Sequence, residues 1–315
     1  MKKHLTILLL LIGSYVCKGQ TIVATGGAEY LNVYLLSNGT VKAFSQNTIT
    51  PALLAYTGVD SIVKVCGGQY TCFTLDQRGR VVELGNEYTS VFQWPVDTTG
   101  SEFKDNFYIA ALYRSFFTIR GTDSTVWYGG NYEPMHYSND GTIKPYQLTQ
   151  PAGSKKFKKL VAGSATNLLN STLVGLTTDG KLYKWVRNTP TPTDITPFGK
   201  TIVDFGMAGQ YGILATTSDN LIYGIGLTNG VYIGQTTHST SWVNITANWP
   251  VTMPIKEIGS GYNVIHLIDA NDNLFGSGSN TMGDIGNGWE HPLLKDGFRT
   301  SGPWNVDIAE NGYDL

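Results

Sequence analysis

Few residues of this sequence are arranged as catalytic groups usually are. The sequence contains neither a Gly-x-Ser-x-Gly nucleophile elbow nor a His-Glu-x-x-His zinc motif. The glycine pairs Gly224/Gly226, Gly259/Gly261 and Gly276/Gly278 lack the third glycine of a dinucleotide-binding loop and fall in predicted strands. We therefore predict no catalytic residues and no cofactor. Distant carboxylates brought together over a central channel would be the exception that spacing alone does not reveal.

The candidates for metal ligands are four histidines and one acidic turn. The histidines beyond residue 20 are His136, His238, His266 and His291. None is spaced from another as local zinc ligands are, and His266 falls in a predicted strand, where a structural role is more common. Asp269 and Asp272 suggest a calcium loop, but equivalent turns elsewhere in the chain indicate an ordinary hairpin. We predict no metal site.

The sequence offers an aromatic surface instead of a reaction centre. The candidates for a binding face are Trp94, Tyr132, His136, Trp242, Trp249 and Trp289. These residues fall in links between predicted strands, where large aromatic side chains often anchor a partner. The alternative is that each ring wedges adjacent elements together. By contrast, Trp127 and Trp185 fall on aligned strands and are predicted to be core residues.

Cys66 and Cys72 flank a short segment between two predicted neighbouring strands. An oxidising compartment would permit a disulfide between them. The alternative is that both are small buried residues that pack within a sheet. Cα atoms more than about 7 Å apart could not be bridged, so geometry decides between the two interpretations.

A repeat organises the chain, and its copies align on a hairpin turn. The turn positions are Gly39, Gly79, Ser124, Gly180, Asn220 and Asp272. Two residues later every copy has an apolar residue that we expect to point inward: Val41, Val81, Val126, Leu182, Ile222 and Leu274. In the last copy, Gly259 and Gly261 are expected to let backbones approach closely. The spacing of 40 to 56 residues is typical of propeller blades.

The last copy, Ile255–Gly288, resembles the regulator-of-chromosome-condensation (RCC1) repeat family, in a secreted bacterial type. Its segment 280–286, Asn-Thr-Met-Gly-Asp-Ile-Gly, is similar to the Asn-x-x-Gly-Gln-Leu-Gly run of that family. Tyrosines replace the histidine that often follows the first glycines of the family repeat: Tyr70, Tyr211 and Tyr262. The resemblance implies a β-propeller that binds proteins through one face, and one extracellular bacterial relative inhibits β-lactamases. It does not extend to nucleotide exchange.

The expected fold is therefore an all-β β-propeller with six complete blades and the opening strand of a seventh. The segment Val306–Tyr313 provides that opening strand, with Gly312-Tyr313 matching Gly261-Tyr262. A seven-bladed ring, as the resemblance implies, would then be incomplete. The alternative is a six-bladed ring sealed by the terminal strand, because an unpaired edge is a liability.

Residues 1–19 are expected to be a secretory signal peptide. Lys2 and Lys3 precede the apolar run Leu5–Ile12, which is shorter than the roughly 20 residues of a membrane span. Small residues at Cys17 and Gly19 predict cleavage before Gln20, so one propeller domain would cover residues 20–315. A lipoprotein anchor at Cys17 is the less favoured alternative, because Val16 precedes the cysteine.

Cleavage would leave 19 basic and 24 acidic residues, a net charge near −5. That charge does not favour nucleic acid as a partner. The sequence thus predicts a monomeric, extracytoplasmic binding module, whether secreted, periplasmic or at the cell surface, without a membrane span. Its partner would be an extracellular protein. The alternatives are a carbohydrate-binding or carbohydrate-active propeller and a structural or adhesive surface component.

Overall fold

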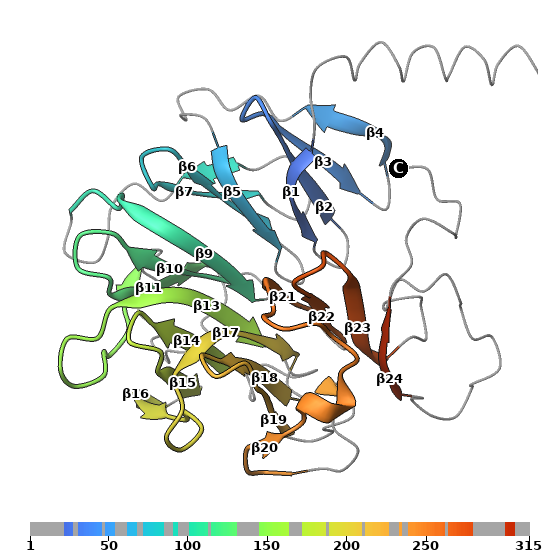
Figure 1. Ribbon diagram of the computed structural model, residues 1–315. Helices are drawn as coiled ribbons and strands as arrows, with labels where there is room; N and C mark the ends of the chain where they lie inside the picture. Colours follow the sequence, from blue (N-terminus) through green and yellow to red (C-terminus); the bar gives the residue numbers. More distant parts are fainter. Residues whose placement is uncertain are drawn as a thin grey trace, which may run out of the picture. The chain divides into compact units, whose positions relative to one another are not determined.

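The computed structural model describes residues 22–27, 31–45, 48–53, 62–67, 72–84, 91–93, 101–112, 115–130, 145–163, 172–186, 189–209, 212–226, 233–234, 239–261, 264–279 and 300–305. These residues form four-stranded antiparallel sheets, in each of which neighbouring strands follow one another along the chain (Figure 1). This arrangement confirms the predicted all-β class. The expected opening strand Val306–Tyr313 and the expected leader lie outside the described residues.

The sheets are named here in chain order, and the strands keep the labels of Figure 1. The first sheet has β1 (Ile22–Gly27), β2 (Leu31–Leu36), β3 (Val41–Ser45) and β4 (Thr48–Leu53). The second has β5 (Ile62–Gly67), β6 (Cys72–Asp76), β7 (Val81–Leu84) and β8 (Val91–Gln93). The third has β9 (Asn106–Leu112), β10 (Ser115–Arg120), β11 (Val126–Gly130) and β12 (Tyr146–Gln147).

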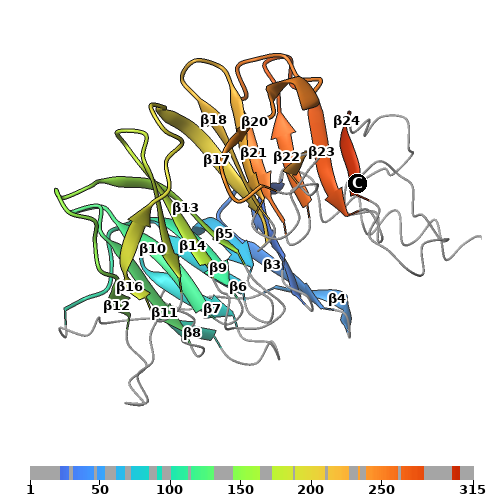
Figure 2. The ribbon, with the colours of Figure 1, turned by 90° about the horizontal axis from the view of Figure 1, so that it is seen from below.

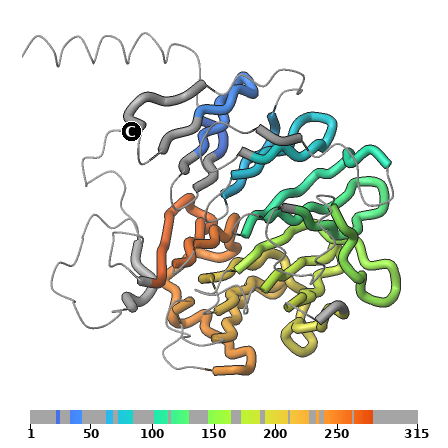
Figure 3. The backbone as a smooth tube through the Cα atoms, turned by 180° about the vertical axis from the view of Figure 1, so that it is seen from behind, coloured from blue at the N-terminus to red at the C-terminus, as the bar shows by residue number. Residues whose placement is uncertain are grey.

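The later sheets repeat this order, and the coloured part of residues 157–278 runs from light green to orange-red in Figure 3. The fourth has β13 (Phe157–Gly163), β14 (Thr172–Thr177), β15 (Leu182–Val186) and β16 (Thr189–Asp194). The fifth has β17 (Ile202–Ala208), β18 (Gly212–Thr217), β19 (Ile222–Gly226) and β20 (Val243–Asn244), followed by the 3-10 helix η3 (Thr246–Asn248). The sixth has β21 (Glu257–Ser260), β22 (Val264–Ile268), β23 (Leu274–Ser279) and β24 (Thr300–Asn305).

The chain divides into two compact units. The N-terminal unit comprises residues 1–120, 129–131 and 143–146, and the C-terminal unit comprises residues 121–128, 132–142 and 147–315. Each unit has its own core. In the N-terminal unit, Phe73, Phe103 and Phe116 are fully buried and their rings meet at 5.3 Å and 6.1 Å between centroids. The prediction of one domain over residues 20–315 stays a prediction.

The hairpin between the second and third strands of each sheet forms as predicted. All six aligned turn positions have a positive φ: 78° at Gly39, 71° at Gly79, 58° at Ser124, 78° at Gly180, 60° at Asn220 and 65° at Asp272. Five of the aligned apolar residues that follow are completely buried: Val41, Val81, Val126, Leu182 and Ile222. Leu274 is half-buried. The turn residues therefore set the register, and the apolar residues direct the third strand toward the core.

The fifth and sixth sheets lie side by side in the C-terminal unit (Figure 2). Their backbones meet where Gly209 donates a 2.9 Å hydrogen bond to the carbonyl of Gly261. This contact confirms the close approach predicted at Gly261. The same prediction is wrong for Gly259, because a Cβ atom there would lie 3.6 Å from the nearest atom, an ordinary contact.

Candidate protein-binding surface

Two of the six predicted binding residues, Trp242 and Trp249, belong to the described part of the chain. Trp94, Tyr132, His136 and Trp289 lie outside it, so their binding role stays a prediction. Trp242 and Trp249 both lie in the segment that leads from the fifth sheet to the sixth. Their environments differ sharply.

Trp249 is a core residue. Its side chain is 4% exposed and packs in a hydrophobic cluster with Ile233, Ile245 and Ile258. A Cβ atom on Gly234 would lie only 2.6 Å from its indole nitrogen, so the ring fills the space that this glycine leaves. Burial favours the packing alternative for Trp249 over a contact with a partner.

Trp242 is half-buried and ties the fifth sheet to the link that precedes it. Its indole N–H donates to the carbonyl oxygen of Ile195, between β16 and β17. One side of the ring packs against the hydrophobic cluster that contains Phe205 and Ile213. The neighbouring residue, Val243, is 41% exposed on the edge strand β20. Trp242 is therefore held by a hydrogen bond and by packing, and the residue as a whole stays half-buried.

Phe198 is fully exposed at the tip of that same link. The Lys200 backbone N–H donates to the Pro197 carbonyl at 3.1 Å, and Gly199 has a φ of +69°. This geometry is that of a type II turn, which requires glycine at the third position and presents the second residue outward. Gly199 has open space around it, so the backbone angle alone accounts for its choice.

The link is held rigidly at its base. Ile195 donates its backbone N–H to Leu182, and the Leu182 N–H donates to the Thr196 hydroxyl, both at 2.9 Å. Ile202 in turn donates to the carbonyl of Gly180 at 2.9 Å. The Phe198 ring therefore projects from an anchored turn.

A charged pair and a tyrosine lie next to this turn. The Lys200 ammonium is 2.7 Å from the Asp219 carboxylate and 5.5 Å from the centroid of the Tyr223 ring. The hydrogen bond to Asp219 raises the pKa of Lys200, and the same bond lowers the pKa of Asp219. Across the ladder, Tyr223 pairs with Asn244 of β20. Both charges are thus retained across the physiological pH range.

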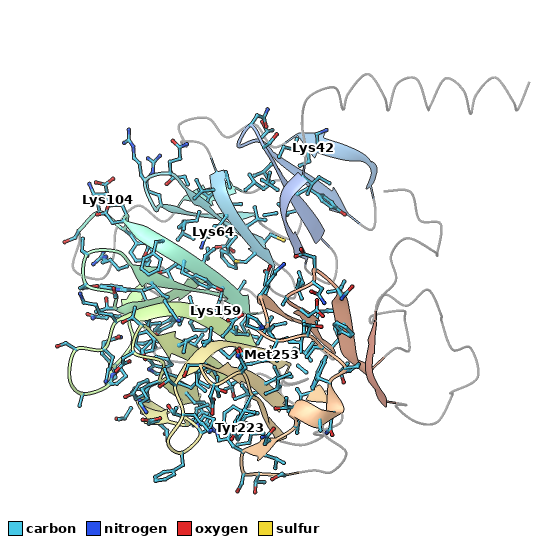
Figure 4. All side chains as sticks on the ribbon, viewed as in Figure 1. Lys42, Lys64, Lys104, Lys159, Tyr223 and Met253 are labelled. Carbon is cyan, nitrogen blue, oxygen red and sulfur yellow. The ribbon has the colours of Figure 1, made fainter. Side chains whose placement is uncertain are left out.

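We call these residues the Phe198 surface: Phe198, Lys200, Tyr223, Trp242 and Val243. Contacts connect these residues: Trp242 bonds to the base of the link, Lys200 lies over the Tyr223 ring, and Tyr223 pairs with the edge strand. Tyr223 is labelled in Figure 4 at this end of the fifth sheet. Exposed apolar and aromatic groups beside one charged pair are the composition of protein-binding surfaces.

Sequence analysis missed Phe198, although a local signal was present. The tripeptide Pro197-Phe198-Gly199 places a glycine at the third turn position, where a type II turn requires a positive φ. The link before the fourth sheet has Pro151-Ala152-Gly153, and Gly153 also has a positive φ of 84°. The two links thus share a Pro-x-Gly tripeptide with a positive φ at its glycine, and the middle residue is alanine in one and phenylalanine in the other.

Cys66 and Cys72 lie on adjacent strands and are not joined by a disulfide. The ladder pairs Cys66 with Phe73 and Gly67 with Cys72, and side chains alternate along a strand, so the two thiols point to opposite faces. Burial raises the pKa of Cys72 to about 12, and burial together with the nearby Cys72 raises the pKa of Cys66 well above its ordinary value. This arrangement favours the packing alternative over a disulfide.

The described residues contain no group of three or more His, Cys, Asp or Glu side chains that could hold a metal ion. None of the helical segments in the described part of the chain has the length and apolar character needed to cross a membrane. Neither finding extends to the rest of the chain.

No protein-family model matches the sequence, and no curated protein is similar to it. Similar solved structures do exist. Human WBSCR16 is 14% identical, with a TM-score of 0.71 over 92% of this chain and 82% of that one. Prp20p of Saccharomyces cerevisiae is 16% identical, with a TM-score of 0.61 over 79% of this chain and 68% of that one. YCF48, solved with the D1 peptide, is 12% identical, with a TM-score of 0.53 over 84% and 83%.

These similarities show the fold. Prp20 is the yeast RCC1 protein, so the chain has the fold of RCC1-like β-propellers, as the repeats predicted. The Prp20p structure was described together with binding to Gsp1p and histones. A second structure shows Prp20 as yeast RCC1 bound by Kap60.

Proposed function

We propose that the protein is a non-catalytic binding module that acts outside the cytoplasm and binds a partner protein through the Phe198 surface. The observation that carries this proposal is the full exposure of Phe198 on an anchored turn. Burying a phenylalanine side chain is worth roughly 1.5–3 kcal/mol, so a partner that covers this ring gains that free energy. Because the turn is already ordered, little conformational entropy is lost on binding.

Three further observations support the proposal. Proteins of this fold bind other proteins or peptides, as the Prp20p and YCF48 structures record. The Lys200–Asp219 pair supplies a polar rim beside the apolar centre. The location outside the cytoplasm rests on residues 1–19, whose sequence has the pattern of a signal peptide.

Phe198→Ala tests the proposal. The wild-type chain, immobilised on beads, would be exposed to proteins released by the source cells, and captured proteins would be identified by mass spectrometry. We expect Phe198→Ala to weaken capture of the specific partner by roughly tenfold or more, as the loss of a central aromatic anchor does. Its melting temperature should not change, because the ring is fully exposed.

The matched control is Val63→Ala. Val63 is 45% exposed on β5 of the N-terminal unit and does not belong to the Phe198 surface. Its replacement should leave capture unchanged. Equal capture by wild type and Phe198→Ala would contradict the proposal. Binding confined to a glycan array would favour the carbohydrate-binding alternative instead.

A further inference from the structure

The fourth strand of each described sheet lies at a sheet edge, and four of these six edges have a proline in the strand or directly before it. Proline lacks a backbone N–H and therefore blocks the addition of another strand. The prolines are Pro51 in β4, Pro145 directly before β12, Pro190 and Pro192 in β16, and Pro303 in β24. For β8, the next proline in the sequence is Pro95, which lies outside the described residues. Around β20 the sequence has no proline between Pro197 and Pro250.

The edge of β16 shows how such a block works. Ile195 donates its N–H inward to Leu182, and Thr193 pairs with Lys184, so the backbone nitrogen of the buried Pro192 lies at the intervening position and points away from β15. An added strand would find no donor there. The fourth sheet is thus closed to strand addition beside the link that carries Phe198.

The edge of β20 has no proline that would block the addition of a strand. Ile245 donates inward to Ile222, and Val243 pairs with Gly224, so the backbone groups of Trp242 and Asn244 face outward. Among the described residues, the structure shows no backbone hydrogen bond to these outward groups. The exposed Val243 side chain lies between them. The edge thus offers backbone donors and acceptors around an apolar side chain.

We propose that β20 is a strand-addition site, at which an extended segment of the partner protein pairs with Trp242–Asn244. This inference rests on the proposed function and names the form in which the partner binds. Strand addition takes its affinity from main-chain hydrogen bonds and its specificity from alternate side chains. The incoming segment would therefore have apolar residues at alternate positions, directed at Val243 and toward the Phe198 surface.

Panning a library of random 12-residue peptides displayed on phage against the immobilised full chain tests this proposal. We expect enriched peptides that alternate apolar and polar residues. Asn244→Pro should weaken binding of an enriched peptide by about tenfold or more, because it removes an outward N–H and inserts a ring at the edge. The inward ladder bonds of Val243 and Ile245 are not touched by this change.

Asn244→Ala is the matched control. It removes the side-chain oxygen that accepts hydrogen bonds from the Thr246 N–H at 3.0 Å and from its hydroxyl at 2.7 Å, but it keeps the backbone N–H. Binding to this variant should stay within about twofold of wild type. If Asn244→Pro does not fold, N-methylation of alternate amides in the enriched peptide provides the same test on the wild-type chain. N-methylation should weaken binding only at every second residue of the peptide.

Several results would overturn the proposal. They are a library without enriched peptides, equal binding to Asn244→Pro and Asn244→Ala, and N-methylation effects without alternation. Dimerisation of the wild-type chain that Asn244→Pro abolishes would show that a second copy occupies the edge, which also contradicts a peptide partner. Loss of protein capture in Phe198→Ala with unchanged capture in Asn244→Pro would keep the proposed function and reject strand addition.

Discussion

Two aromatic side chains of the C-terminal unit show how one type of residue serves opposite purposes. Phe198 is fully exposed, whereas Trp185 on β15 is 1% exposed. The Trp185 ring packs against Phe157 at 5.3 Å between centroids, and its indole N–H donates to the Thr149 carbonyl at 2.9 Å. Trp185 therefore supports the fourth sheet from within, as the sequence predicted.

Two replacements of Trp185 should separate the contribution of its hydrogen bond to stability from that of its ring packing. Trp185→Phe keeps most of the buried ring but leaves the Thr149 carbonyl without its donor, which should lower the free energy of unfolding by about 1–3 kcal/mol. Trp185→Ala adds a cavity and should lower it by about 3–5 kcal/mol. Chemical denaturation measures both values. A Trp185→Phe protein as stable as wild type would show that the hydrogen bond contributes nothing.

At the scale of the element, the hairpins between the second and third strands of the second, fourth, fifth and sixth sheets share one feature. The residue three positions before the turn centre accepts hydrogen bonds from the turn backbone. Thr177 accepts through its hydroxyl from Lys181 at 2.9 Å, and Thr217 accepts in the same way from Leu221 at 3.0 Å. Asp269 accepts from both Asn271 and Asn273 at 2.9 Å. The polar residue at this position closes the turn that the positive-φ residue begins.

Asp269 makes the stability of its hairpin depend on pH. Burial alone would raise the pKa of this carboxyl, but hydrogen bonds from Thr252, Asn273 and Asn271 outweigh it and lower the pKa to about 2. Because the folded pKa lies below the ordinary value of 3.8, the stabilisation is present above about pH 4 and is lost as the pH falls toward 2. We expect the melting temperature of wild type to fall over that range.

Asp269→Asn should be less stable at neutral pH, and its melting temperature should depend less on pH between 4 and 2. The control is Asp272→Asn in the same hairpin, whose side chain is 79% exposed and pairs with Lys256 at the surface. That variant should melt nearly as wild type does at neutral pH. Parallel pH profiles for Asp269→Asn and wild type would contradict the role of the carboxylate.

At the scale of the whole molecule, one carboxylate joins three sheets of the C-terminal unit. Asp204 on β17 is 2.8 Å from the Lys159 ammonium of β13 and accepts the Ile258 backbone N–H of β21 at 3.1 Å. Lys159 also donates to the Ile258 carbonyl at 3.2 Å. These first strands, β13, β17 and β21, neighbour one another in Figure 1. The lysine-rich segment 155–159 therefore provides a structural ion pair to the next sheet.

The cellular location of the protein is also a prediction about the whole chain. We expect the mature protein to appear outside the cytoplasm and to begin at Gln20, because Cys17 and Gly19 provide the small residues of a cleavage site. Fractionation followed by N-terminal sequencing measures both. Lys2 and Lys3 replaced by glutamate should retain the uncleaved precursor inside the cell. A cytoplasmic protein that keeps Met1 would contradict the extracytoplasmic assignment.

The sequence alone determined the architecture of the repeats. Turn residues such as Gly180, Asn220 and Asp272 and the apolar positions that follow them are local signals, because backbone angles and alternating burial act within a few residues. The β class, the hairpin positions and the buried Trp185 followed from those signals, and the repeat family predicted the propeller fold.

Only the tertiary structure decided which side chains face outward from the links between sheets. Trp242 and Trp249 lie in the same segment between the fifth and sixth sheets, yet Trp249 fills the space beside Gly234 and Trp242 remains partly exposed. Burial there depends on residues distant in sequence, such as Ile195 and Ile258. The open edge of β20 likewise becomes visible only once the outer strand of each sheet is known, because strand order is set by packing and not by any local pattern.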